Sequence, residues 1–187
     1  MMKKLSRVLI MILLLLTMSG CSKDKDGALK ALDKDQVVAV QHDLEVFSGG
    51  NVSEITERIF GTESDEMSTN NSSNGIIADL FANAEVQITS SDESTISYTI
   101  VSPDISDFFT AYADQLDSIT TSEELGQAIL EYAEAAPMKE YTVTIPYSVV
   151  EDEINVSYND PDFINAMTGG LLEAYSALYD QYLTEEG

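Results

Sequence analysis

The sequence predicts an α+β fold, in which an antiparallel sheet of two hairpins, about four strands, packs against helices. Residues 86–100 and 141–158 alternate apolar and polar side chains, and each stretch has an acidic, polar turn near its middle, as expected of half-buried hairpins. Pro146 has no backbone N–H to donate to a neighbouring strand, so it predicts that its strand lies at a sheet edge or has a bulge there. The segments around these hairpins repeat apolar side chains at helical spacing. Helices grouped against an antiparallel sheet define the α+β class.

Helices are expected before the first hairpin. An amphipathic helix begins at Asp35, and Asn51 with Glu54 resembles a capping box that opens a second, shorter helix. In that helix Glu54 is expected to pair with Arg58 at i,i+4. Residues 61–75 are nearly devoid of apolar side chains and predict an exposed loop, after which another helical turn or two follows.

Two further helices are expected between the hairpins, and one after them. Ser102-Pro103 predicts an N-cap with proline at the first helical position, and Thr121 with Glu124 predicts a capping box. A long C-terminal helix is expected to start at Asp160, as its cap, and Pro161. Gly169-Gly170 interrupts it, which predicts either a close approach to the sheet or a local bend.

The first twenty residues carry the pattern of a secretory signal peptide. Basic residues precede an apolar run of about eleven residues, well short of the roughly 20 that a membrane-spanning helix needs. The junction Met18-Ser19-Gly20-Cys21 resembles the lipobox of bacterial lipoproteins. That resemblance implies that the thiol of Cys21 receives a diacylglycerol and that the chain is cut before it. A transmembrane anchor and ordinary secretion with a free thiol are the alternatives.

The chain therefore divides into a signal peptide (1–20), the lipidated cysteine with a basic flexible tether (21–34) and a single acidic α+β domain (35–187). Cleavage removes three basic residues and no acidic one, so the formal net charge goes from −24 to −27. The expected location is the cell membrane, lipid-anchored, on its extracytoplasmic face. Lysines in the tether favour contact with an anionic leaflet.

Charge also limits the partners. Beyond residue 34 the only basic residues are Arg58 and Lys139, so the domain is expected to be repelled by phosphate backbones, and nucleic acid is excluded as a partner. Solubility at a crowded cell surface explains such negative charge, and a specific cationic partner is the alternative.

The chain has few of the side chains that enzymes commonly use as nucleophiles and bases, with one histidine and one cysteine. His42 is the only histidine, and its position relative to Val40 and Leu44 predicts that it points to solvent. Cys21 is committed to lipid, which removes thiol nucleophiles, disulfides and thiolate metal sites. The acidic stretches at 151–153 and 159–162 lack the spacing of an EF-hand, and we predict no cofactor and no metal site.

Residues 84–107 and the terminal sequence DPDFINAMTGGLLEAY resemble the NTF2-like and cystatin-like domains of small secreted lipoproteins of Gram-positive bacteria. This resemblance implies a fold and supports the location, but it implies no activity. NTF2-like domains often enclose a cavity on the concave side of their sheet. The resemblance therefore implies a candidate pocket lined by tyrosines on the apolar hairpin faces: Tyr98, Tyr141, Tyr147 and Tyr158. Packing of these tyrosines against the helices is the alternative.

Three functions remain open. The first is a non-catalytic, lipid-anchored domain that binds a small ligand or a protein partner at the cell surface. The second is an NTF2-like enzyme that uses a carboxylate in the sheet cavity, which a strongly raised carboxyl pKa in a deep pocket would favour. The third is an acidic inhibitor or immunity-type protein for a basic partner.

Overall fold

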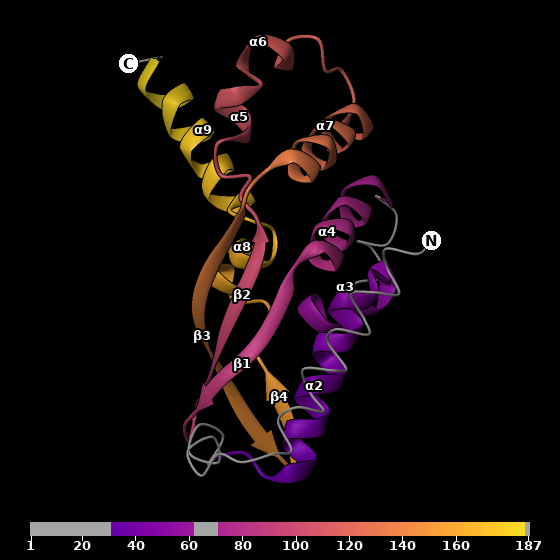
Figure 1. Ribbon diagram of the computed structural model, residues 1–187, viewed down its shortest axis with the longest axis vertical. Coiled ribbons are helices and arrows are strands. Elements are labelled where there is room, and N and C mark those ends of the chain that lie inside the picture. Colours follow the sequence, from indigo (N-terminus) through magenta and orange to yellow (C-terminus); the bar gives the residue numbers. More distant parts are fainter. Residues whose placement is uncertain (1–30, 62–70, 186–187) are drawn as a thin grey trace.

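The computed structural model describes residues 31–61 and 71–185. The expected signal peptide, Cys21 and most of the tether lie outside the described residues, as does the central part of the expected loop at 61–75. The elements, drawn in Figure 1, are α2 (Lys34–Gly49), α3 (Val52–Phe60), α4 (Asn71–Asn83), β1 (Glu85–Ser91), β2 (Thr95–Pro103), α5 (Phe108–Ala111), α6 (Ala113–Leu116), α7 (Ser122–Ala135), β3 (Met138–Val150), β4 (Glu153–Val156), α8 (Pro161–Met167) and α9 (Leu171–Glu185).

The four strands form one antiparallel sheet in the order β1-β2-β3-β4, which confirms the predicted α+β class and both predicted hairpins. The β3–β4 turn is tight, because Glu151 and Asp152 both adopt positive φ. The β1–β2 turn is held by the Asp92 carboxylate, which accepts hydrogen bonds from the backbone nitrogens of Ser94 and Thr95 at 2.9 and 2.8 Å.

One face of the sheet is covered by helices and the other is open. Ile96, Tyr98 and Ile100 of β2 are fully buried, whereas the alternate residues from Thr95 to Val101 are only partly buried. Helices α2, α4 and α8 contact this sheet, and Figure 1 shows α2 and α4 running alongside it. This single buried face explains the alternating pattern in the sequence.

Pro146 lies where β3 changes partners. Residues 138–146 of β3 pair with β2, and residues 147–150 pair with β4. The carbonyl oxygen of Pro146 accepts a hydrogen bond from the backbone nitrogen of Ser157 at 3.0 Å. The proline therefore stands at a transition between two ladders, where its missing N–H interrupts neither of them.

Two predictions about helix starts were wrong. Ser102-Pro103 does not begin a helix but ends β2, where Pro103 pairs with Met138 and the Ser102 hydroxyl donates to the carbonyl oxygen of Ala166 at 2.7 Å. Two short helices, α5 and α6, follow instead of one longer helix. The second error concerns the loop at 61–75, because α4 already begins at Asn71. No proline precedes its apolar residues to stop the helix from extending backward.

The long C-terminal helix was also a wrong prediction, since two shorter helices, α8 and α9, take its place. They are separated by Gly169 and Gly170, whose φ angles of 65° and 88° lie in the left-handed region. The carbonyl oxygen of Gly169 accepts a hydrogen bond from the backbone nitrogen of Ile105 at 2.8 Å. The glycines thus provide both a bend and a close approach to the end of β2.

The buried side chains form two clusters. The first lies between the sheet and helices α2, α3, α4 and α8, and it includes Phe47, Tyr98 and Phe163. The second joins α4, α5, α7 and α9 through residues such as Leu80, Phe108 and Ile129. Helices α5, α6, α7 and α9, here called the helical cap, lie at the end of the molecule opposite to the β3–β4 turn (Figure 1). Within residues 31–61 and 71–185, no helix is long and apolar enough to cross a bilayer.

We predict that Gly169→Ala destabilises the fold by about 2 to 4 kcal/mol, because the added Cβ would overlap the carbonyl oxygen of Pro103 and the residue must keep positive φ. Gly49→Ala is the matched control: nothing lies within 4 Å of its added Cβ, and it sits in a helix with ordinary φ. This control should change stability by less than about 1 kcal/mol. Urea unfolding measures both, and equal stability of the two variants would contradict the close packing at Gly169.

Candidate functional site

The four tyrosines of the predicted pocket lie on one side of the sheet. In the strand register Tyr98 is opposite Val143, and Tyr141 and Tyr147 lie two and four residues from Val143 along β3, so their side chains share its face. Tyr158 follows the end of β4 and is also buried in the cluster beneath the helices. The prediction that these residues occupy the apolar face is confirmed.

Tyr98 and Tyr158 meet in the core. Their rings pack on Phe163 with centroid separations of 5.6 and 5.3 Å, and the Tyr158 ring also meets Phe47 edge-on at 4.9 Å. Both tyrosines are at most 2% exposed. The space between the sheet and α8 is therefore filled by aromatic rings at this point.

Tyr141 and Tyr147 are only partly buried, and each contacts a different part of the chain. The Nζ atom of Lys139 lies 5.0 Å from the centre of the Tyr141 ring, and it also pairs with the Asp104 carboxylate at 3.7 Å. The Tyr147 hydroxyl donates to the carbonyl oxygen of Asp92 at 2.7 Å, which ties β3 to the β1–β2 turn. A single pocket lined by all four tyrosines remains a prediction.

A buried carboxylate beside these tyrosines was missed by sequence reasoning. Asp43 lies on α2 three residues after Val40 and four before Phe47, both fully buried, and its side chain is only 11% exposed. Its place on the apolar stripe of α2 was the signal that could have revealed it. The guanidinium Nε of Arg58 on α3 lies 3.2 Å from the Asp43 carboxylate.

This ion pair corrects the predicted pairing of Arg58 with Glu54. A carboxylate that is removed from water needs a partner far more than an exposed one does, and α3 packs against α2 so that Arg58 reaches it. Glu54 instead accepts a hydrogen bond from the Asn51 amide at 2.9 Å, within the predicted N-cap of α3.

The pKa of Asp43 lies above its ordinary value because burial disfavours the charged form. Arg58, the Tyr158 hydroxyl and His42 oppose this rise, in that order, and only in part. Burial likewise raises the pKa values of Tyr98 and Tyr158, so both hydroxyls stay protonated at neutral pH. Asp43, Arg58, Tyr158 and Tyr98, here called the Asp43 cluster, lie close together between α2, α3 and the sheet, and the buried Tyr98 and Tyr158 hydroxyls have no hydrogen-bond partner within the described part of the chain.

His42 lies next to this cluster in sequence but points away from it. Its side chain is 64% exposed and its Nδ1 atom lies 3.8 Å from the Glu45 carboxylate, which confirms the prediction that it faces solvent. Since the imidazole is not directed toward the Tyr158 hydroxyl, the site offers no histidine base positioned beside a hydroxyl nucleophile.

The acidic stretches considered for calcium have structural roles. The Asp160 carboxylate caps α8 by accepting from the backbone nitrogens of Asp162 and Phe163, as predicted. Glu151 and Asp152 form the tight β3–β4 turn. Among the described residues, no three histidine, cysteine or acidic side chains gather closely enough to hold a metal ion.

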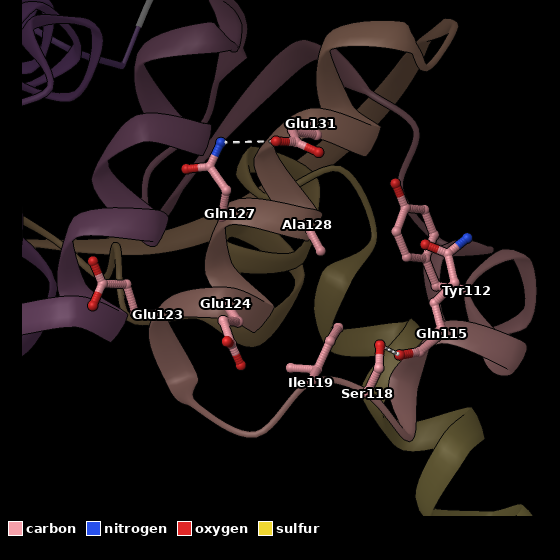
Figure 2. Close-up of a pocket in the computed structure, with 9 residues that line it drawn as sticks. All are labelled: Tyr112, Gln115, Ser118, Ile119, Glu123, Glu124, Gln127, Ala128 and Glu131. Atoms are coloured by element: carbon pink, nitrogen blue, oxygen red, sulfur yellow. Dashed lines mark hydrogen bonds between the residues drawn. The ribbon is translucent and has the colours of Figure 1, made fainter.

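The helical cap contains an open hollow of about 440 Å³, which sequence reasoning did not anticipate. It lies between α6, the connection that follows it, and α7 (Figure 2). Its lining residues come from the segment around α6 and from α7, which no sequence pattern pairs: Tyr112, Gln115, Ser118, Ile119, Glu123, Glu124, Gln127, Ala128 and Glu131. No local pattern could have revealed it, because it depends on how α6 and α7 are placed.

We predict that Asp43→Asn changes the free energy of unfolding relative to the wild type by an amount that depends on pH. This difference, wild type minus variant, should increase as the pH falls from 7 to about 4. The folded-state pKa of Asp43 is raised, so its stabilising contribution is fully present below the unfolded value of 3.8 and is lost as pH rises through the folded value. Urea unfolding at several pH values measures the difference.

Glu45→Gln is the control for this prediction, because it removes one negative charge from an exposed position of the same helix. The difference between wild type and Asp43→Asn should change with pH beyond any change that Glu45→Gln produces. A difference that instead grows toward high pH would mean that ionised Asp43, paired with Arg58, is favourable overall.

Comparison with known proteins gives no relative: no protein-family model, curated protein or solved structure matches this chain. The function must therefore be inferred from its residues and their geometry.

Proposed function

We propose that this chain is a lipoprotein precursor whose mature domain binds a small ligand or a protein partner and catalyses no reaction. Cys21 is lipidated, residues 1–20 are removed, and the domain is held on the extracytoplasmic face of the cell membrane. One observation carries the location: the chain's single cysteine stands at the junction Met18-Ser19-Gly20-Cys21, directly after a basic segment and a short apolar run. A diacylglycerol supplies the two acyl chains that stable anchoring requires.

The placement of α2 fits an anchor at one end of the molecule. Helix α2 begins beside the β3–β4 turn, and the helical cap lies at the opposite end (Figure 1). We propose that the cap, with its open hollow, is the part directed away from the membrane. That arrangement suits a domain that meets partners or ligands outside the cell.

The fold proposed for the domain is NTF2-like or cystatin-like. Support comes from the antiparallel four-stranded sheet with helices on one face and from the opening helix α2, which packs near β4. The absence of a long C-terminal helix sets this chain apart from the form that the sequence predicted.

The geometry of the Asp43 cluster supports binding rather than catalysis. Asp43 is almost fully enclosed and is already paired with Arg58, and His42 faces solvent. A general base must reach the proton that it abstracts, and an enclosed, paired carboxylate does not reach an incoming substrate.

An NTF2-like enzyme that uses Asp43 is the second candidate. The observation that favours it is the raised pKa of this carboxyl beside the Tyr158 hydroxyl, since catalytic acids and bases often have shifted pKa values. Structural ion pairs shift pKa values as well, and the enclosure of Asp43 fits that role better.

We predict that the full chain, expressed in a bacterial host, is labelled by a fatty-acid analogue and that Cys21→Ser abolishes the label, because no other cysteine can carry the lipid. Lys23→Ser is the matched control, since it introduces serine two residues later and leaves the thiol in place. Gel fluorescence of the membrane fraction measures the label. Equal labelling of wild type and Cys21→Ser would show that Cys21 is not lipidated.

We predict that a thermal-shift screen of the full chain in detergent finds compounds or partners that raise its melting temperature, since a ligand that binds only the native state stabilises it by mass action. None should be consumed during the measurement. Steady turnover of a compound that Asp43→Asn abolishes, while Glu45→Gln retains it, would establish the enzyme instead.

A further inference from the structure

The hollow in the helical cap has an apolar floor. Figure 2 shows Tyr112 on one side, Ala128 of α7 on the other, and Ile119 below them. The Tyr112 ring is held in place, because it stacks on Phe108 at 4.8 Å and meets Tyr132 edge-on at 5.9 Å. A fixed aromatic ring beside aliphatic carbon is a surface on which an apolar group can be desolvated.

The rim of the hollow is acidic. Glu124, Ala128 and Glu131 follow one another at helical spacing along one face of α7, so the two carboxylates flank the apolar centre. The Gln127 amide donates to Glu131 at 3.1 Å, as drawn in Figure 2. Glu123 adds a third carboxylate, and no lysine or arginine is among the lining residues.

Among the described residues, no lysine or arginine forms an ion pair with these carboxylates. Hydrogen bonds from Thr120 and Thr121 lower the pKa of Glu124 and keep it ionised at neutral pH. The two basic residues that follow Lys34 in the sequence are used elsewhere, Arg58 with Asp43 and Lys139 with Asp104. The Glu124 carboxylate is held by these hydrogen bonds at the start of α7, and no described lysine or arginine neutralises the negative charge around the hollow.

We infer that this hollow binds a small organic cation, that is, an alkylated ammonium group with an apolar surface. The carboxylates attract its charge, and the Tyr112 ring with Ile119 and Ala128 receives its methyl or methylene groups. A hydrated inorganic cation gains nothing from an apolar floor, and an anion is repelled by the rim. This inference rests on the proposed binding function and names the ligand class for it.

The test is a titration of the isotope-labelled full chain with choline chloride, followed by amide NMR shifts in a non-ionic maltoside detergent. Phosphocholine detergents are avoided because they carry the same trimethylammonium group. Sodium chloride at equal concentration controls for ionic strength. The uncharged alcohol in which a carbon atom replaces the nitrogen controls for the apolar contribution.

Saturable shifts confined to residues 112–131 are expected with choline, and the uncharged analogue should bind at least about five-fold more weakly. Glu131→Gln should weaken choline binding by about two- to five-fold, whereas Glu140→Gln, which removes a charge from an exposed position on β3, should not. Tyr112→Leu should weaken it by a similar factor, with Tyr179→Leu on exposed α9 as its control.

Tyr112→Phe keeps the ring and should keep the affinity, which separates loss of the aromatic surface from loss of the fold. If Tyr112→Leu does not fold, Glu131→Gln decides the matter, because its side chain is exposed. Equal binding of the uncharged analogue, shifts spread over the whole domain, or no shifts at millimolar choline would each overturn the inference. Any of these results, together with a different ligand found in the thermal-shift screen, would leave the proposed binding function intact.

Discussion

The contact between the α8–α9 junction and the end of β2 is the constraint on which the two cores of this domain depend. Gly169 lies so close to Pro103 that only a residue without a side chain fits, and its carbonyl oxygen bonds Ile105, which is buried in the second core. On the sheet side, the Ser102 hydroxyl bonds the carbonyl oxygen of Ala166, a member of the first core. The contact between residues 102–105 and residues 166–169 therefore fixes the position of the helical cap relative to the sheet.

Electrostatics imposes a second constraint on a domain with so few basic residues. Arg58 and Lys139 both lie next to partly enclosed carboxylates, Asp43 and Asp104. Lys139 also lies over the Tyr141 ring, with its Nζ atom 5.0 Å from the ring centre. Most of the other carboxylates of the described residues are exposed, and ion pairs at such positions would contribute little to stability.

Features set by neighbours in the chain could be predicted from the sequence, and features set by distant contacts could not. The hairpins and the cap at Asp160 follow from alternation and from local hydrogen bonding. Ser102-Pro103 satisfied the same local rule for a helix start, but pairing with Met138 far along the chain decided its conformation. In the candidate site, the faces of the tyrosines and of His42 were predictable, whereas the partner of Asp43 and the hollow beside Tyr112 depend on how helices pack.

The two ends of the segment between β2 and β3 lie side by side. Pro103 pairs with Met138, and the backbone nitrogen of Asp104 donates to the carbonyl oxygen of Pro137 at 2.8 Å, so the chain leaves the sheet and returns to it at one point. The sheet itself therefore places no demand on the length of residues 104–137, because closing a longer loop costs little additional entropy. In topological terms this segment is an excursion from one hairpin, and its helices cover Leu80 and Leu171. Specificity for a new ligand could thus arise in the cap without any change to the sheet that supports it.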